Sequence, residues 1–231
     1  MIPLSIIAAE AQELSGLLPH LREVRALRWP VAYAVEAMLR DVPVTLAANG
    51  PGPRLARKAA SLAAGHFSSS LFLSTGFCGG LAPELGVGEI IAASEIRGED
   101  GHRYPARLPQ TPARSGVIYS GDRVACTVAE KSDLHRTGAV AVEMEAATVA
   151  GVAAETGRGF YCVRVVSDTA ADEFPLDFNR YRDAEGRFDR RRIAMAALFH
   201  PFRRVPGLLR LKSNCAVAAC KLGEFLANCR F

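Results

Sequence analysis

The chain has 231 residues, of which 49% are hydrophobic and 23% are charged. This length and composition indicate one large globular domain, and they exclude a disordered chain, a collagen-like repeat and a disulfide scaffold. No apolar run reaches the roughly 20 residues that a membrane-spanning helix needs. The net charge of +4 is unevenly distributed, because ten Lys and Arg residues stand against two acids between Arg187 and Phe231. The sequence therefore predicts an acidic body with a basic C-terminal end.

The N-terminal segment and the cysteines indicate the compartment. Residues 1–9 are apolar without a basic start, and the run ends at Glu10, so a secretory signal peptide is not expected. None of the six cysteines forms a C-x-x-C pair or stands at zinc-site spacing to a histidine. We therefore expect a cytoplasmic protein with isolated thiols and no metal site.

Hydrophobic patterning predicts strands and helices in alternation along most of the chain. In chain order, we expect a strand at 4–9, a helix at 10–20, a hairpin of strands 33–39 and 42–48, a helix at 53–67, strands at 70–74, 87–96 and 117–120, a helix at 144–156, a strand at 160–166, and helices at 189–199 and 205–228. Segments 98–112 and 174–188 are predicted to be irregular. Continuously apolar strands are typical of a buried parallel sheet, and the hairpin makes that sheet mixed. The sequence thus predicts an α/β domain over residues 1–200 and a basic helical extension over residues 201–231.

Polar or glycine-rich segments follow several of the predicted strands, where ligands bind in open α/β sheets. They are Glu10 with Glu13, the segments 49–52, 75–80 and 143–145, and Ser167-Asp168. Segment 49–52 does not fit a dinucleotide fingerprint, because Leu55 replaces the third glycine and two prolines remove amide donors. Each segment alone also fits a tight turn or a helix cap, but their shared location indicates one site.

Glu13, Glu145 and Asp168 come from three different strand ends, and together they are compatible with cleavage of an N-glycosidic bond. In that reaction positive charge develops on the sugar while the departing base must be protonated, a nucleophile activated and the ribose hydroxyls held. A carboxylic acid can protonate a base nitrogen, one carboxylate can orient water and another can accept hydrogen bonds from two hydroxyls. The residue types alone make this one compatible chemistry among several.

Four segments resemble, in order, the motifs of the purine nucleoside and uridine phosphorylase superfamily. They are STGFCGGLAP at 74–83, GVIYSGD at 116–122, AVAVEMEAATVA at 139–150 and VRVVSDTA at 163–170. The resemblance implies a three-layer αβα sandwich with a mixed, twisted central sheet over residues 1–200. It also implies a purine nucleoside as substrate and no cofactor, with phosphate as a co-substrate only if the chain is a phosphorylase.

The pattern is most similar to the methylthioadenosine/adenosylhomocysteine nucleosidase branch of that superfamily. This likeness implies that Glu13 activates the attacking water, that Glu145 binds the ribose hydroxyls and that Asp168 donates a proton toward purine N7. Asp168 must then keep its proton near neutral pH, which burial favours. The other implied substrate-binding residues are Phe77, Cys78, Gly79, Val124, Ala125, Glu143, Met144 and Ser167.

Two positions depart from that branch. Val124 and Ala125 stand where the base is held by stacking and backbone contacts, but the usual aromatic residue is missing there. Phe77 stands where a serine usually faces the nucleophile, so the pocket is expected to be drier at that point. Met144, which matches the methionine under the sugar, and Ser167, which orients the aspartate, follow the pattern.

The attacking group is expected to be water rather than phosphate. The resembling phosphorylases use a G-D-P-x-R loop and an arginine ahead of the glycine loop, whereas this chain has Ala8-Ala9-Glu10 and Ser74 at those places. Arg180 or Arg182 could still supply positive charge, so phosphorolysis stays open as an alternative. A non-catalytic nucleoside- or lipid-binding module on the same fold is the second alternative.

The C-terminal part of the chain resembles, more loosely, a hopanoid-associated subgroup of bacterial nucleosidases. The segments that carry this likeness are 174–176, 186–189 and 200–211, and the substrate that it implies is adenosylhopane. Leucines and cations in the extension form a basic amphipathic helix, which suits peripheral contact with an anionic membrane. Packing on its own body or in a homodimer, which the family also implies, is the alternative. Nucleic acid is not an expected partner, because the extension has few stacking aromatics.

Overall fold

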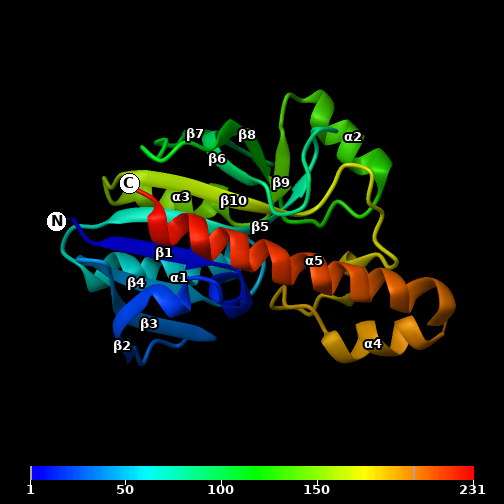
Figure 1. The fold of residues 1–231 in the computed structure, drawn as a ribbon, viewed down its shortest axis with the longest axis horizontal. Coiled ribbons are helices and arrows are strands. Elements are labelled where there is room, and N and C mark those ends of the chain that lie inside the picture. Colours follow the sequence, from blue (N-terminus) through cyan, green and yellow to red (C-terminus); the bar gives the residue numbers. More distant parts are fainter. Residues whose placement is uncertain (1, 200) are drawn as a thin grey trace.

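A mixed β-sheet forms the centre of the protein in the computed structural model, which describes residues 2–199 and 201–231 (Figure 1). Within those residues the sheet has ten strands, in the order β10-β6-β8-β9-β5-β1-β4-β3-β2 with β7 beside β6. The strands are β1 (Leu4–Ala8), β2 (Leu21–Ala26), β3 (Tyr33–Leu39), β4 (Val42–Ala48), β5 (Leu71–Gly80), β6 (Ile90–Gly98), β7 (Arg103–Pro105), β8 (Arg114–Ser120), β9 (Ala141–Glu143) and β10 (Phe160–Asp168). Strand β10 pairs with both β5 and β6, so this half of the sheet closes on itself.

Helices cover both faces of the sheet, which confirms the predicted three-layer α/β arrangement. The helices are α1 (Pro53–His66), α2 (Val128–Arg136), α3 (Ala146–Glu155), α4 (Arg190–Leu198) and α5 (Pro201–Asn228), with short 3-10 turns η1 (Ala11–Leu14), η2 (Leu18–His20) and η3 (Phe178–Tyr181). Alanine-rich faces of α1 and α3 pack into one core cluster. The second half of α5 packs into another on the opposite face. None of the helices in the described residues is long and apolar enough to cross a membrane.

The predicted hairpin, helix 53–67 and most strands are confirmed, but the predicted helix at 10–20 is wrong. The structure has only the short turns η1 and η2 there. Gly16, between them, lies against α5 so closely that a Cβ at this position would be 2.2 Å from the carbonyl oxygen of Ala219. Pro19 lies in η2 and lacks the amide proton that a continuous helix would need. The segment is therefore shaped by a distant helix rather than by its own periodicity.

Other differences have local causes. The glycine-rich segment 75–80 is the second half of β5 rather than a loop, and it pairs with β10 as far as Asp168. Helix α5 begins at Pro201 and includes Pro206, although the sequence predicted a start at residue 205. Strands β2 and β7 and helix α2 were not predicted, although Thr127 and Glu130 form a capping box at the start of α2. The domain boundary at residue 200 stays a prediction.

The contact between α5 and the η1–η2 segment leads to a prediction about stability. Replacing Gly223 by Ala should lower the free energy of unfolding by about 1–3 kcal/mol, the usual cost of overpacking. A Cβ on Gly223 would lie 2.0 Å from the backbone carbon of Gly16, so the two segments must separate. Chemical denaturation of this variant should be compared with that of Gly65→Ala in α1. A Cβ at Gly65 meets nothing within 4 Å, so this control should be neutral or stabilising. Equal stability of the two variants would contradict the prediction.

Candidate active site

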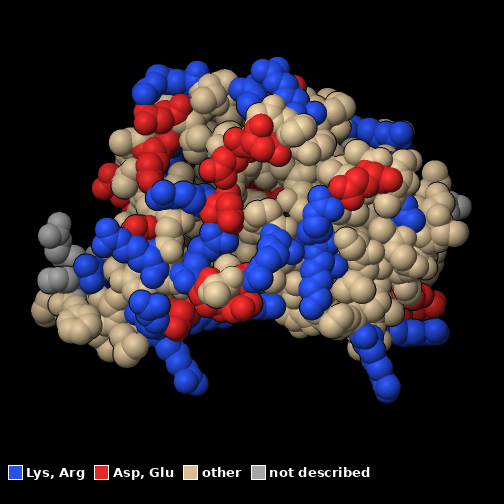
Figure 2. Space-filling model, turned by 180° about the vertical axis from the view of Figure 1, so that it is seen from behind, with Lys and Arg blue, Asp and Glu red and all other residues tan. Residues whose placement is uncertain are grey.

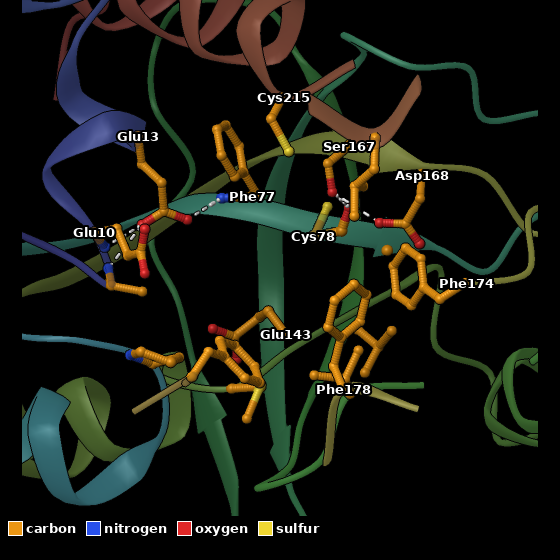
Figure 3. A pocket seen from close by; sticks show the side chains of 18 of the residues that line it. Glu10, Glu13, Phe77, Cys78, Glu143, Ser167, Asp168, Phe174, Phe178 and Cys215 are labelled. Carbon is orange, nitrogen blue, oxygen red and sulfur yellow. Dashed lines mark hydrogen bonds between the residues drawn. The ribbon is translucent and has the colours of Figure 1, made fainter. Parts of the chain in front are cut away.

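A pocket of about 370 Å³ lies at the carboxyl ends of β1, β5, β9 and β10, within the range typical of small-molecule sites (Figure 3). Each site residue predicted from the sequence lines it: Glu13, Phe77, Cys78, Gly79, Val124, Ala125, Glu143, Met144, Glu145, Ser167 and Asp168. Segments 74–83, 139–150 and 163–170 meet there because β5, β9 and β10 end at this edge of the sheet. Segment 116–122 stops just short of Arg123, Val124 and Ala125, which line the pocket.

Glu13 is held rigidly at one side of the pocket. Its Oε2 accepts hydrogen bonds from the backbone N–H groups of Ala9 and Glu10, at 2.8 and 2.9 Å, and its Oε1 accepts one from Phe77 at 2.8 Å. Gly76 has a φ of 136° and lets β5 pass beside this carboxylate, because a Cβ there would lie 2.5 Å from Oε1. Burial raises the pKa of Glu13, against the lowering effect of Arg164 and of the backbone hydrogen bonds. A carboxylate with a raised pKa is better suited to accept a proton near neutral pH.

Arg164, which the sequence analysis did not single out, lies fully buried on β10 under the pocket. It forms an ion pair with Glu143, and its Nη1 lies 3.6 Å from Oε2 of Glu145. Its other bonds are to the Ser74 hydroxyl at 2.9 Å and the Thr75 carbonyl at 3.0 Å. Ser74 therefore stands where the resembling phosphorylases have an arginine, and its hydroxyl accepts a hydrogen bond from Arg164 instead.

The two glutamates of the E-M-E segment have different surroundings. Both oxygens of Glu143 accept hydrogen bonds from the first backbone N–H groups of α3, in addition to the Arg164 pair. Glu145 accepts one bond, at 2.8 Å, from the backbone N–H of Gly52, so it keeps acceptor capacity for a ligand. Burial and the charge of Glu143 raise the pKa of Glu145 to about 8, against the effect of Arg164. Glu143 therefore fits a positioning role and Glu145 fits contact with a ligand.

Asp168 lies on the opposite side of the pocket from Glu13, at the end of β10 (Figure 3). Its Oδ1 accepts a hydrogen bond from Ser167 Oγ at 2.8 Å, and its Oδ2 lies 2.6 Å from Nζ of Lys131. Lys131 is 1% exposed, and it also donates to the carbonyl oxygens of Thr169 and Asp172. Burial raises the pKa of Asp168, as the sequence analysis expected, while Lys131 and Ser167 act in the lowering direction. The sequence analysis did not identify Lys131.

Aromatic side chains line the pocket beside Asp168, although none stands at positions 124 and 125. Phe174 and Phe178 lie next to Asp168 in Figure 3, with ring centroids 5.3 Å apart and edge to face. The side chain of Asn179 bonds both backbone groups of Val124, at 2.9 and 3.0 Å, and so attaches this segment to the opposite wall. A planar base can therefore find aromatic partners from the segment predicted to be irregular.

The remaining wall comes from the C-terminal helices. Ile193 on α4 and Leu211 and Cys215 on α5 give it an apolar surface, together with Phe188. Arg123 and Arg190 also line the pocket, and Arg190 forms an ion pair with Glu10 at 2.6 Å. Phe188 and Leu211 lie in segments that carry the looser C-terminal resemblance, but only the packing of α4 and α5 shows that these residues line the site.

The two arginines that the sequence analysis considered for phosphate do not line the pocket. Arg180 is exposed and pairs with Asp177 at 3.2 Å. Arg182 pairs with Asp122 at 2.7 Å and donates to the carbonyl oxygen of Gly186. Both are therefore engaged outside the cavity. Across residues 2–199 and 201–231, His, Cys, Asp and Glu form no group of three or more that could hold a metal ion.

Comparisons with known proteins show the family of this chain. The family model described as "Phosphorylase superfamily" matches residues 6–115 and 105–198. The 5'-methylthioadenosine/S-adenosylhomocysteine nucleosidase of Oceanobacillus iheyensis is 26% identical, over 80% of this chain and 93% of the relative. The nucleosidase of the same name from Haemophilus ducreyi is 28% identical, over 78% of this chain and 90% of the relative.

Solved structures share the fold. A Neisseria meningitidis 5'-methylthioadenosine/S-adenosylhomocysteine nucleosidase in complex with methylthio-immucillin-A has a TM-score of 0.73 and 21% identity, covering 98% of this chain and 97% of that one. A futalosine hydrolase of Helicobacter pylori has a TM-score of 0.72 and 16% identity, with coverage of 97% and 95%. The family match extends over most of the chain and includes the strands that build the pocket, so this chain is an enzyme that belongs to the phosphorylase superfamily.

Proposed function

We propose that the protein hydrolyses the N-glycosidic bond of a purine nucleoside and releases free adenine. The observation that carries this proposal is the convergence of Glu13, Glu145 and Asp168 on one pocket, with Glu13 and Asp168 on opposite sides. Relatives that bear the name nucleosidase, at 26–28% identity, support the same reaction class.

The residue roles follow from the surroundings of each carboxyl group. Asp168 donates a proton to purine N7 while the bond between N9 and C1′ breaks and its electron pair moves to the base. Glu145 accepts hydrogen bonds from the ribose hydroxyls. Glu13 orients the water that adds to C1′ and takes its proton. Met144 packs under the sugar, and Phe174 and Phe178 hold the base.

The charges around the sugar position favour water over phosphate. Glu13, Glu143 and Glu145 surround one cation, Arg164, which is already bonded to Glu143 and to the backbone. Because Arg164 compensates Glu143, each further carboxylate that ionises, Glu13 or Glu145, leaves a negative excess that stabilises the positive charge developing on the ribose in the transition state. The same excess repels a phosphate dianion at that place. Arg123 and Arg190 line the pocket and are the observation that keeps phosphorolysis as the second candidate.

The substrate carries a large apolar group at its 5′ position. The wall formed by Ile193, Leu211, Cys215 and Phe188 supports this, because it offers apolar surface beyond the polar groups that hold the base and the ribose. An adenosyl-lipid such as adenosylhopane, released to adenine during hopanoid biosynthesis, fits that wall. The protein needs no cofactor, resides in the cytoplasm and acts as a homodimer.

Release of adenine tests the proposal directly. The protein should liberate adenine from methylthioadenosine, adenosine or an adenosyl-lipid in phosphate-free buffer, with the free sugar as the second product. Chromatography of both products gives the answer, because phosphorolysis would yield a sugar 1-phosphate and would require added phosphate. Adenine from none of the three substrates, with or without phosphate, would remove the enzymatic function and favour the non-catalytic binding module.

A further inference from the structure

The end of the α4–α5 hairpin presents large apolar side chains to solvent. Phe199 is 80% exposed and Phe202 is 94% exposed, and Leu198 and Met195 beside them are also exposed. We call these four residues the hairpin tip. On α5 the apolar face continues, since Leu209 follows Phe202 by seven residues and is exposed as well. Single exposed apolar residues are ordinary, but a group of this size at one end of a molecule marks an interaction surface.

Exposed cations lie on both helices of the hairpin, behind its tip. The sequence has no Asp or Glu from Arg190 to Gly223, whereas Arg191, Arg192 and Lys212 are exposed. Among the described residues, these three side chains make no salt bridge to an acid. In Figure 2 this end of the molecule lies on the left, with uncharged surface at its extremity and Lys and Arg side chains beside it. An apolar tip with cations on the helices behind it suits an anionic bilayer, because the tip can enter the interface while the cations reach the lipid headgroups.

The same hairpin forms the apolar wall of the pocket. Ile193 on α4 lines the pocket, and Phe199 lies six residues further along, about 9 Å at the rise of an α-helix. On α5, Leu211 and Cys215 line the pocket, while Phe202 and Leu209 on the same helix are exposed to solvent. A surface that holds the hairpin tip would therefore lie close to the part of the pocket that is apolar.

We propose that the hairpin tip docks the protein on an anionic lipid bilayer, where Phe199 and Phe202 enter the interface and Arg191, Arg192 and Lys212 contact lipid headgroups. The delivery of a lipid-attached nucleoside to the adjacent pocket rests on the proposed function; the docking itself does not. It needs only the exposure and charge of the hairpin.

A second copy of this chain is a poorer occupant of the same surface. A twofold interface joins a patch to its own copy, so it would bring Arg191, Arg192 and Lys212 against the same cations of the other subunit. No acid between residues 190 and 223 is available to compensate them. An anionic bilayer can bury the apolar side chains and bind the cations at the same time.

Vesicle co-sedimentation with the full chain tests this docking. The protein should pellet with vesicles of phosphatidylcholine and phosphatidylglycerol, and at least tenfold less with phosphatidylcholine alone or at high salt. The double variant F199S/F202S should lose at least tenfold in binding. The double variant V24S/L108S is the matched control, because Val24 and Leu108 are exposed apolar residues outside the hairpin, and it should bind as the wild type does.

Equal pelleting of the wild type and F199S/F202S, or no pelleting of the wild type, would overturn the docking. So would sedimentation analysis that shows F199S/F202S converting a dimer to a monomer, since the hairpin tip would then be a contact between copies. Cleavage of soluble methylthioadenosine by both double variants should match that of the wild type. If the wild type itself does not cleave methylthioadenosine, this result counts against the proposed function, and the vesicle experiment still decides the docking.

Discussion

Replacing Asp168 by Asn should lower kcat by about three orders of magnitude, within the range that a positioned general acid contributes. An amide has nearly the same shape and can still accept from Ser167, but it cannot release a proton to the departing base. Binding of the nucleoside should change less than kcat, because the aromatic and ribose contacts stay in place. Steady-state release of adenine and direct binding of a non-hydrolysable nucleoside analogue separate the two quantities.

The matched control for this variant is Asp133→Asn, an equivalent change at an exposed carboxylate on α2. It should leave kcat within about twofold, because surface substitutions are near neutral. A pH profile adds a second test. The proton on Asp168 is needed for the reaction, so wild-type kcat/KM should fall as pH rises through the pKa of Asp168. An Asp168→Asn protein that keeps more than a tenth of wild-type kcat would show that the general acid is another group.

The sequence was most informative where side chains able to take part in catalysis stand at the ends of strands. Glu13, Glu145 and Asp168 could be assigned to one site because each follows an apolar segment, and the carboxyl ends of parallel strands meet at one edge of a sheet. The motifs then extended the site to neighbouring residues such as Ser167 and Met144, and all of these line the pocket. Both signals are local in the sequence, and this is why they could be recognised without a structure.

The groups that the sequence did not predict are those that depend on contacts between distant segments. Lys131 looks like an ordinary helix cation, and only the fold brings it to Asp168, 37 residues further along. Gly16 ends a turn because α5 lies on it, a contact with residues more than 200 positions away. Phe174 belongs to a segment that resembles the hopanoid-associated subgroup, but that likeness does not show that its ring lies beside Asp168.

The structure shows where the acidic and the basic residues of the chain lie. Part of the acidity of the body lies where a cationic transition state would form, around Arg164. The basic excess of the C-terminal part is divided. Arg190 and Arg210 pair with acids of the body, Glu10 and Asp172, while the cations near the hairpin tip face solvent. The net charge of the chain is therefore the sum of three groups: the carboxylates of the pocket, the cations paired with the body and the cations that face solvent.

Replacing Lys131 by Met should reduce kcat by about 100-fold and change the pH profile, although Lys131 acts through Asp168 rather than on the substrate. As Asp168 gives its proton to the base, it becomes a carboxylate, and the ammonium 2.6 Å away stabilises that charge. Without the cation, the effect of burial on Asp168 is opposed only by the weaker effect of Ser167, so its pKa rises further. The alkaline limb of kcat/KM should then move to higher pH, since Asp168 keeps its proton longer. The acid limb, which reflects ionisation of the glutamates, should stay in place.

Stability gives a readout of the same pair that does not depend on turnover. In the Lys131→Met protein a buried carboxylate lacks its partner, which typically costs about 3–5 kcal/mol in the free energy of unfolding. The folded-state pKa of Asp168 would lie above its unfolded value. The penalty should therefore grow as pH rises from the unfolded pKa of Asp168 to its folded pKa, level off above the folded pKa and disappear below the unfolded one.

A second substitution decides whether these effects come from the ion pair. In the double variant Lys131→Met, Asp168→Asn the buried charge is gone, so most of the lost stability should return and its pH dependence should disappear. Thermal unfolding across a pH series measures both. If the double variant is as unstable as Lys131→Met alone, Lys131 stabilises the protein through its bonds to the carbonyl oxygens of Thr169 and Asp172, and not through Asp168. If its stability is restored while Lys131→Met alone keeps the wild-type pH profile, the pair is structural and the proton transfer is independent of the lysine.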